Sequence, residues 1–157
     1  MAQTATSEMV GATEAPVTLA RDRNVAHIRM ARPTGPAARA TATTQKRRAY
    51  LNLENVTSDG VPSSYGIYLN LGDGDPEQNR QLFAGLLPAF GVKEASQKDE
   101  HNPGSGLNRA IDVTHIVEWL QANNRWDPDH LHVTFVPRGK NAGEVPVKVG
   151  RASLYYK

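Results

Sequence analysis

The sequence predicts a mainly β protein, an antiparallel β-sandwich or flattened barrel with one short α-helix. Short segments in which apolar and polar residues alternate recur along the chain, and turn residues separate them. The 157 residues include 13 glycines and 10 prolines, which favour a turn-rich β protein over a helical bundle. Only one segment places apolar residues at helical spacing.

The chain is expected to divide into an N-terminal arm, residues 1–47, and a β domain, residues 48–157. Within the arm, residues 10–19 and residues 25–30 have the pattern of short edge strands. Residues 31–45 contain no large apolar side chain, so they are interpreted as a flexible linker or a long loop.

The first half of the β domain contains two half-buried strands. Residues 50–56 and 65–71 alternate apolar and polar positions, and turn residues follow each of them. Residues 82–92 are apolar but interrupted by glycine and proline, which favours a strand with a bulge or a structured loop over a helix. Residues 96–106 are polar and are expected to form a loop.

The one helix is expected at residues 113–123. Asp112 or Thr114 can begin it by accepting hydrogen bonds from amide groups that have no partner within the helix. Its apolar stripe consists of Ile116, Val117 and Leu120.

Two strands are expected at the end of the β domain. Residues 131–136 have alternating apolar positions, and Pro137 ends this strand. In residues 145–156 the apolar positions change phase at Gly150, and a β-bulge is interpreted as the cause because one extra residue turns every later side chain to the other face.

Charge is unevenly distributed along the chain. Residues 21–48 carry a net charge of +7, whereas the remainder carries −5. The basic residues of this segment are Arg21, Arg23, Arg29, Arg32, Arg39, Lys46, Arg47 and Arg48. Such a run can neutralise phosphates, but no aromatic side chain is interleaved for base stacking. A solvated linker is therefore the preferred interpretation, and nucleic acid is not the expected partner.

Cysteine and targeting signals are missing from the sequence. Without cysteine there is no disulfide or zinc–thiolate chemistry. The first 20 residues lack a basic region followed by an unbroken apolar run, and no stretch has the length of a membrane span. We therefore expect a soluble, cytoplasmic chain that does not interact with membranes.

The five histidines do not form a convergent metal-binding pattern. No two of them are four residues apart, the helical spacing at which two imidazoles converge on one ion. His130 and His132 are weak metal candidates because residues two apart on a strand point to the same side. No third ligand is evident, so a solvent-facing pair is preferred. We expect no catalytic residue, metal or cofactor in this chain.

Several motifs of the β domain occur together in one known family. They are residues 65–71 (YGIYLNL), 83–85 (FAG), 106–114 (GLNRAIDVT), 125–129 (RWDPD) and 131–138 (LHVTFVPR). Together they resemble the C-terminal domain of tyrosinases and polyphenol oxidases, the type 3 copper oxidases, and the bacterial type most closely. The resemblance implies a non-catalytic shielding or regulatory domain that covers the dicopper site until it is displaced or cleaved.

The resemblance also implies that an apolar side chain of this domain enters the substrate pocket of the oxidase. The candidates are Leu86, Leu87 and Phe90. Leu87 and Phe90 flank Pro88 and are expected to be exposed, whereas Phe83 is interpreted as part of the domain's own core.

The expected partner is the dicopper catalytic domain, in cis or in trans, and the copper belongs to that partner. A first alternative is a free-standing β-sandwich interaction module that binds another protein, or nucleic acid through the basic arm. A second alternative is a small metal-binding protein that uses its histidines.

Overall fold

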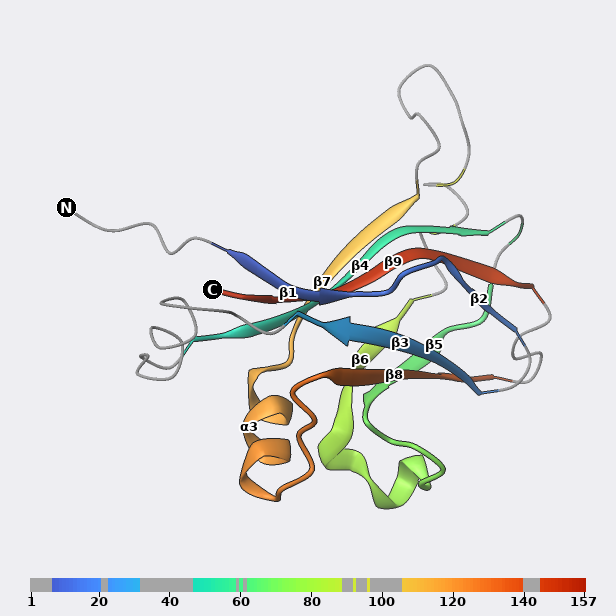
Figure 1. Cartoon of the computed structure of the whole chain (residues 1–157). Coiled ribbons are helices and arrows are strands. Elements are labelled where there is room, and N and C mark those ends of the chain that lie inside the picture. The colour runs from blue at the N-terminus through green and yellow to red at the C-terminus, as the bar shows by residue number, and fades with distance from the viewer. Residues whose placement is uncertain are drawn as a thin grey trace.

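The computed structural model describes residues 7–20, 23–31, 47–58, 60, 62–88, 92, 96, 106–139 and 145–157. Nine strands form one antiparallel sheet, accompanied by two short 3₁₀ helices and the α-helix α3 (Figure 1). The first strands are β1 (Glu8–Ala12), β2 (Val17–Leu19), β3 (Asn24–Met30), β4 (Ala49–Ser58) and β5 (Tyr65–Leu69). The later elements are η1 (Pro76–Gln78), η2 (Arg80–Leu82), β6 (Phe83–Leu87), β7 (Leu107–Asp112), α3 (Thr114–Ala122), β8 (His130–Pro137) and β9 (Val147–Tyr156).

The sheet folds back on itself until its two end strands nearly meet. The strand order is β6-β5-β8-β3-β1-β9-β4-β7, and β2 also pairs with β9. A Cβ atom added to Gly85 of β6 would lie 3.7 Å from the side chain of Ile111 of β7, so the two ends of the order are in contact distance. The described residues therefore confirm the predicted mainly β fold, an antiparallel β-sandwich or flattened barrel with one short α-helix.

Two of the N-terminal strands, β1 and β3, lie inside the sheet rather than at its edge. β3 pairs with β1 on one side and with β8 on the other, and β1 also pairs with β9. Ala26 and Ile28 of β3 are fully buried, so this strand contributes to the core. The expected edge position is wrong for β1 and β3, because a nearly closed sheet leaves few edges. The short strand β2 pairs with β9 on one side only, as an edge strand does. The division into an arm and a domain at residue 48 stays a prediction.

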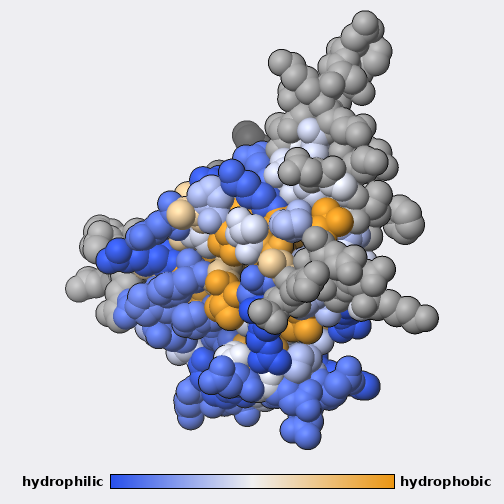
Figure 2. All heavy atoms as spheres, turned by 90° about the vertical axis from the view of Figure 1, so that its right-hand side faces the viewer, coloured by the Kyte–Doolittle hydropathy of each residue, from blue (hydrophilic) through white to orange (hydrophobic). Residues whose placement is uncertain are grey.

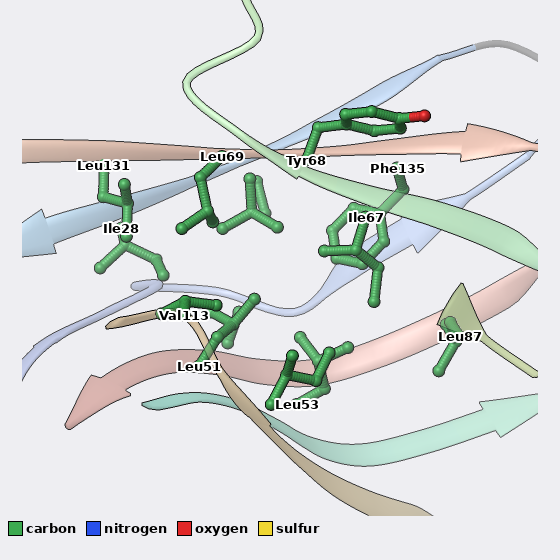
Figure 3. Packing of buried hydrophobic residues seen from close by; sticks show 14 of the residues in the cluster. Ile28, Leu51, Leu53, Ile67, Tyr68, Leu69, Leu87, Val113, Leu131 and Phe135 are labelled. Atoms are coloured by element: carbon green, nitrogen blue, oxygen red, sulfur yellow. The ribbon is translucent and has the colours of Figure 1, made fainter. Parts of the chain in front are cut away.

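The core lies between the two layers of the folded sheet (Figures 1 and 3). Alternating residues of β4, β5 and β8 point into it, as the sequence pattern predicted. The inward-facing residues of these strands are Leu51, Leu53, Tyr65, Ile67, Leu69, Leu131, Val133 and Phe135, all with 0% exposed surface.

Helix α3 closes one end of this core. Its buried residues are the predicted Ile116, Val117 and Leu120. The Asp112 Oδ1 atom accepts hydrogen bonds from the backbone N–H of Thr114 at 3.0 Å and from the Thr114 hydroxyl at 2.6 Å. These bonds lower the pKa of Asp112, with a further contribution from Arg48. No helix of the described residues is long and apolar enough to cross a membrane.

The phase change predicted in the last strand is present, but its origin differs. Val149 and Ala152 are both buried, although they are three positions apart and would face opposite sides of a regular strand. Strand β4 changes phase at the same level, and β4 and β9 keep one register across this point. The register shift at this level is between β4 and β7, from Leu53 to Val56, whereas the shift between β1 and β9 lies farther along, between Met9 and Gly11. The irregularity therefore belongs to the β4–β7 ladder, and the paired strands β4 and β9 turn over together.

Close packing of β4 against β9 explains why residue 150 is a glycine. Asn55 of β4 has a φ angle of +54°. A Cβ atom on Gly150 would lie 2.8 Å from the Cβ atom of Asn55, which is closer than real Cβ contacts. Gly150 is thus required by the approach of β4.

Candidate functional site

Strand β6 presents apolar side chains at one end of the sheet order. Leu87 lies opposite Tyr65 of β5, and Leu86 lies opposite Gly66. Because side chains alternate along a strand, Leu87 points into the core and Leu86 points away from it. Accordingly, Leu87 is 1% exposed and Leu86 is 41% exposed.

Two expectations for this segment are wrong. Leu87 is a core residue, as Figure 3 shows, because its position opposite buried Tyr65 fixes its direction. Phe83, interpreted from the sequence as core, is 37% exposed. It lies opposite Tyr68, whose side chain is on the side of β5 away from Ile67 and Leu69 (Figure 3). Phe90 lies outside the described residues, so its role stays a prediction, as does that of Leu86.

The exposed phenylalanine belongs to a cluster with an aromatic and a cationic neighbour. The ring centroids of Phe83 and Tyr68 are 5.3 Å apart. The guanidinium of Arg138 donates a hydrogen bond to the Tyr68 hydroxyl at 3.1 Å, and its carbon lies 5.5 Å from the Phe83 ring centroid. Gly66 leaves room for Arg138, because a Cβ atom there would lie 2.9 Å from its Nε atom. These contacts hold Phe83 and Arg138 at the surface beside Leu86.

The same outer side of the sheet continues across two further strands. Tyr68 pairs with Thr134 of β8, and Thr134 pairs with Val25 of β3. Val25 is 50% exposed. We name this surface the docking face; its exposed members are Val25, Phe83, Leu86 and Arg138, and the buried Tyr68 supports them from below.

Most of the large apolar side chains exposed among the described residues lie on the docking face. They are Val25, Phe83 and Leu86, whereas Met9 lies on β1. Figure 2 shows one side of the molecule, on which apolar residues gather within hydrophilic surroundings. A surface of apolar side chains with a guanidinium at its centre suits protein binding, since interfaces are enriched in aromatic residues and arginine.

Three histidines form a second cluster on the outer side of β3 and β8. His27 lies directly opposite His132, and its ring is stacked on that of His132 with centroids 4.8 Å apart. The Nε2 atom of His27 and the Nδ1 atom of His130 are 2.8 Å apart, within hydrogen-bond distance. Between the two β8 histidines, Leu131 is fully buried, so His130 and His132 do point outward, as expected.

The environment of this cluster favours neutral imidazole at His132. Partial burial, followed by the positive charges of His27 and His130, lowers the pKa of His132, and Asp127 acts in the opposite direction. Among the described residues, no three His, Asp or Glu side chains already surround one point where a metal could sit. His27 was not predicted as part of this cluster. Its neighbours in sequence do not show that β3 pairs with β8, which follows much later in the chain.

The described members of the basic arm make contacts within the protein. Arg23 donates hydrogen bonds to the carbonyl oxygens of Gly72 and Gly74 at 3.1 and 2.9 Å. The other contacts are ion pairs between Arg29 and Glu14, Arg47 and Glu8, and Arg48 and Asp112. Arg21, Arg32, Arg39 and Lys46 lie outside the described residues. The described arginines therefore help to fasten the N-terminal strands and their neighbours.

Comparison with known proteins gives a family model and one similar curated protein. Residues 6–157 match the family model described as Domain of unknown function (DUF7868). Tyrosinase HcTyr1 of Hahella sp. (strain CCB-MM4) is 30% identical over 150 residues, which are 94% of this chain. The chain spans about a third of that tyrosinase, 32% of its length.

Solved structures of latent aurone synthase, a polyphenol oxidase, have the same fold over part of their length. The recombinantly expressed protein gives a TM-score of 0.54 at 15% identity, covering 92% of this chain and 25% of that one. The protein from its natural source gives a TM-score of 0.53 at 16% identity, covering 92% and 26%. At these identities the similarity shows a shared fold.

Proposed function

Since the chain belongs to the DUF7868 family and aligns almost completely with one third of a tyrosinase, we propose that it is a shielding domain of a tyrosinase-like copper oxidase. In this proposal it is the C-terminal domain, makes no bond-breaking contribution of its own, and covers the dicopper site until it is displaced or cleaved. The observation that carries the proposal is the 30% identity over 150 residues to a third of HcTyr1. The latent polyphenol oxidases that share its fold support the same role.

The docking face supplies the contact surface in this proposal. Leu86 and Phe83 project from β6, and the packing of Phe83 with Tyr68 and Arg138 fixes its position before binding. A pre-positioned side chain loses little conformational freedom on docking. Burial of one leucine or phenylalanine side chain contributes about 2 kcal/mol. Leu86 is the residue that we place in the substrate pocket of the oxidase.

A chimera tests the proposal. The third of HcTyr1 that this chain matches is replaced by the 157-residue chain, so that the two parts are held at high effective concentration. We expect low catechol oxidation by the chimera, and an increase when the joint is cut by a protease. Loss of about 2 kcal/mol of contact energy corresponds to roughly thirtyfold, so Leu86→Asp should raise the activity of the uncut chimera several-fold or more.

Met9→Asp is the matched control for this experiment. Met9 is as exposed as Leu86, 46% against 41%, but lies on β1, away from the docking face. This substitution should leave the chimera as inactive as before. A chimera that oxidises catechol as fast as the isolated catalytic region would overturn the proposed role.

A further inference from the structure

The histidine cluster on β3 and β8 lies outside the proposed docking contacts. We propose that His27, His130 and His132 form a binding site for one divalent transition-metal ion of the copper and zinc type, with Cu(II) bound most tightly. In the shielding proposal the copper belongs to the partner domain, so this site goes beyond that function and does not depend on it.

The strand geometry brings the three imidazoles together. His130 and His132 are two residues apart on β8 and share one side of the sheet, and His27 enters the same side from the neighbouring strand β3. The ring centroids of His27 lie 4.7 Å from His130 and 4.8 Å from His132. Two paired strands in fixed register therefore hold all three rings. The imidazole side chains lose little conformational entropy when they bind a metal ion.

The distances are close to those of a metal-bound set. Imidazole nitrogens bind zinc or copper at 2.0–2.1 Å, so two of them on one tetrahedral ion lie about 3.3 Å apart. The nearest nitrogens of His27 and His130 are 2.8 Å apart. An ion fits between these two nitrogens when the rings separate slightly and the ring that donates the hydrogen bond carries its proton on its other nitrogen instead. Among the described side chains, no three possible ligands surround a common point. His132 must therefore turn its ring out of the stack with His27 before it can bind the same ion.

The surroundings leave space and offset the nearby positive charge. A hollow of about 370 Å³ lies beside the pair and is lined by residues that include His27, His130, Arg29 and Glu14. Arg29 is 3.2 Å from the Glu14 carboxylate, so its charge is compensated next to the site. The hollow provides room for water molecules as the remaining ligands.

The chemistry of the donors selects the class of metal. Three neutral imidazoles suit copper, zinc and nickel, whereas calcium and magnesium prefer oxygen ligands. Within this group Cu(II) forms the most stable complexes at a given nitrogen site. A site made of imidazole alone is therefore expected to bind Cu(II) more tightly than Ni(II) or Zn(II).

Titration of the untagged 157-residue chain with Cu(II) at pH 7.5 tests the site. We expect one tightly bound ion per chain by calorimetry and splitting from imidazole nitrogens in the electron paramagnetic resonance spectrum. His27→Ala and His130→Ala should each raise the Kd for Cu(II) at least tenfold. His115→Ala is the matched control and should leave the Kd unchanged, because His115 is exposed on α3, outside the cluster.

Two results would overturn the proposal. One is a His27→Ala variant that binds Cu(II) as tightly as the unaltered chain. The other is a spectrum of the unaltered chain without nitrogen splitting. Thermal unfolding of each variant without metal checks its fold, and the spectrum of the unaltered chain decides the question even if a variant is unstable.

Discussion

Two adjacent residues, Leu86 and Leu87, point to opposite faces of β6 and should therefore differ in their contribution to stability. Leu87 is buried opposite Tyr65, whereas Leu86 is 41% exposed opposite Gly66. Leu87→Ala should lower the free energy of unfolding by about 2–4 kcal/mol, because it removes buried methyl groups and leaves a cavity. Leu86→Ala should change it by less than about 0.5 kcal/mol. Urea denaturation of both variants measures the difference, and equal losses would contradict the assignment.

The sequence could not decide between these two leucines. The segment around them is apolar at nearly every position, so it has no alternating pattern from which a face can be read. An irregularity in the pairing of β6 with β5, between Ile67 and Tyr68, also shifts which residues share a face. The outward direction of His130 and His132 was predictable, because apolar Leu131 and Val133 alternate with them. The third member, His27, depends on pairing between distant strands.

At the scale of elements, the start of α3 depends on an ionised carboxylate. The hydrogen bonds from Thr114, with Arg48 nearby, lower the pKa of Asp112 below its ordinary value of 3.8. A lowered pKa in the folded state means stabilisation that is complete above the ordinary pKa and is lost as the pH falls through the lowered one. Val113 is the N-cap residue of α3 and makes no side-chain capping bond. Asp112→Ala should cost about 1 kcal/mol at pH 7, because it removes the carboxylate that accepts the N–H of Thr114, the first residue of the helix.

The pH dependence of unfolding separates this effect from simple loss of a side chain. The difference between the unaltered protein and Asp112→Ala should shrink as the pH falls below the ordinary pKa of 3.8. Chemical denaturation at pH 7, 5 and 3.5 measures it. Asp73→Ala, at an exposed turn, is the control and should have little effect. A difference that stays constant down to acid pH would contradict the role of the charge.

Elements with purely local signals were predictable. The helix has its apolar stripe and Asp112 within a dozen residues, and the structure places it at Thr114–Ala122. The strands with clean alternation were also correct in type. The phase change at Gly150 could be read from the sequence, but its cause could not. A register shift is a property of two paired strands, and the sequence of one strand does not show which strand it pairs with.

At the scale of the whole molecule, we expect the N-terminal strands to be required for folding. A chain beginning at residue 47 lacks β1, β2 and β3, so β8 loses its pairing with β3 and β9 loses β1 and β2. It also loses buried Leu19, Ala26 and Ile28. We expect this shortened chain to show no cooperative thermal unfolding by circular dichroism. A chain beginning at residue 7, which keeps every described strand, is the control and should unfold cooperatively.

Cooperative unfolding of the chain that begins at residue 47 would instead support the arm-and-domain division. The sequence favoured that division because the basic segment after β3 resembles a linker in composition. Composition describes how a segment interacts with water, but it carries no information on which strands the flanking segments will join. The fold class was predictable from alternation alone, whereas the order of strands was not.

The pairing of β9 has a consequence for the nascent chain on the ribosome. Its neighbours are β1 and β2 on one side and β4 on the other, and Glu8 pairs with Tyr156. Synthesis must therefore reach the last strand before the two layers can be joined. Contacts so distant in sequence make folding slow, and unpaired strands are prone to aggregate meanwhile. We therefore expect these strands to fold more slowly, and with a greater risk of aggregation, than a helical bundle with the same number of residues.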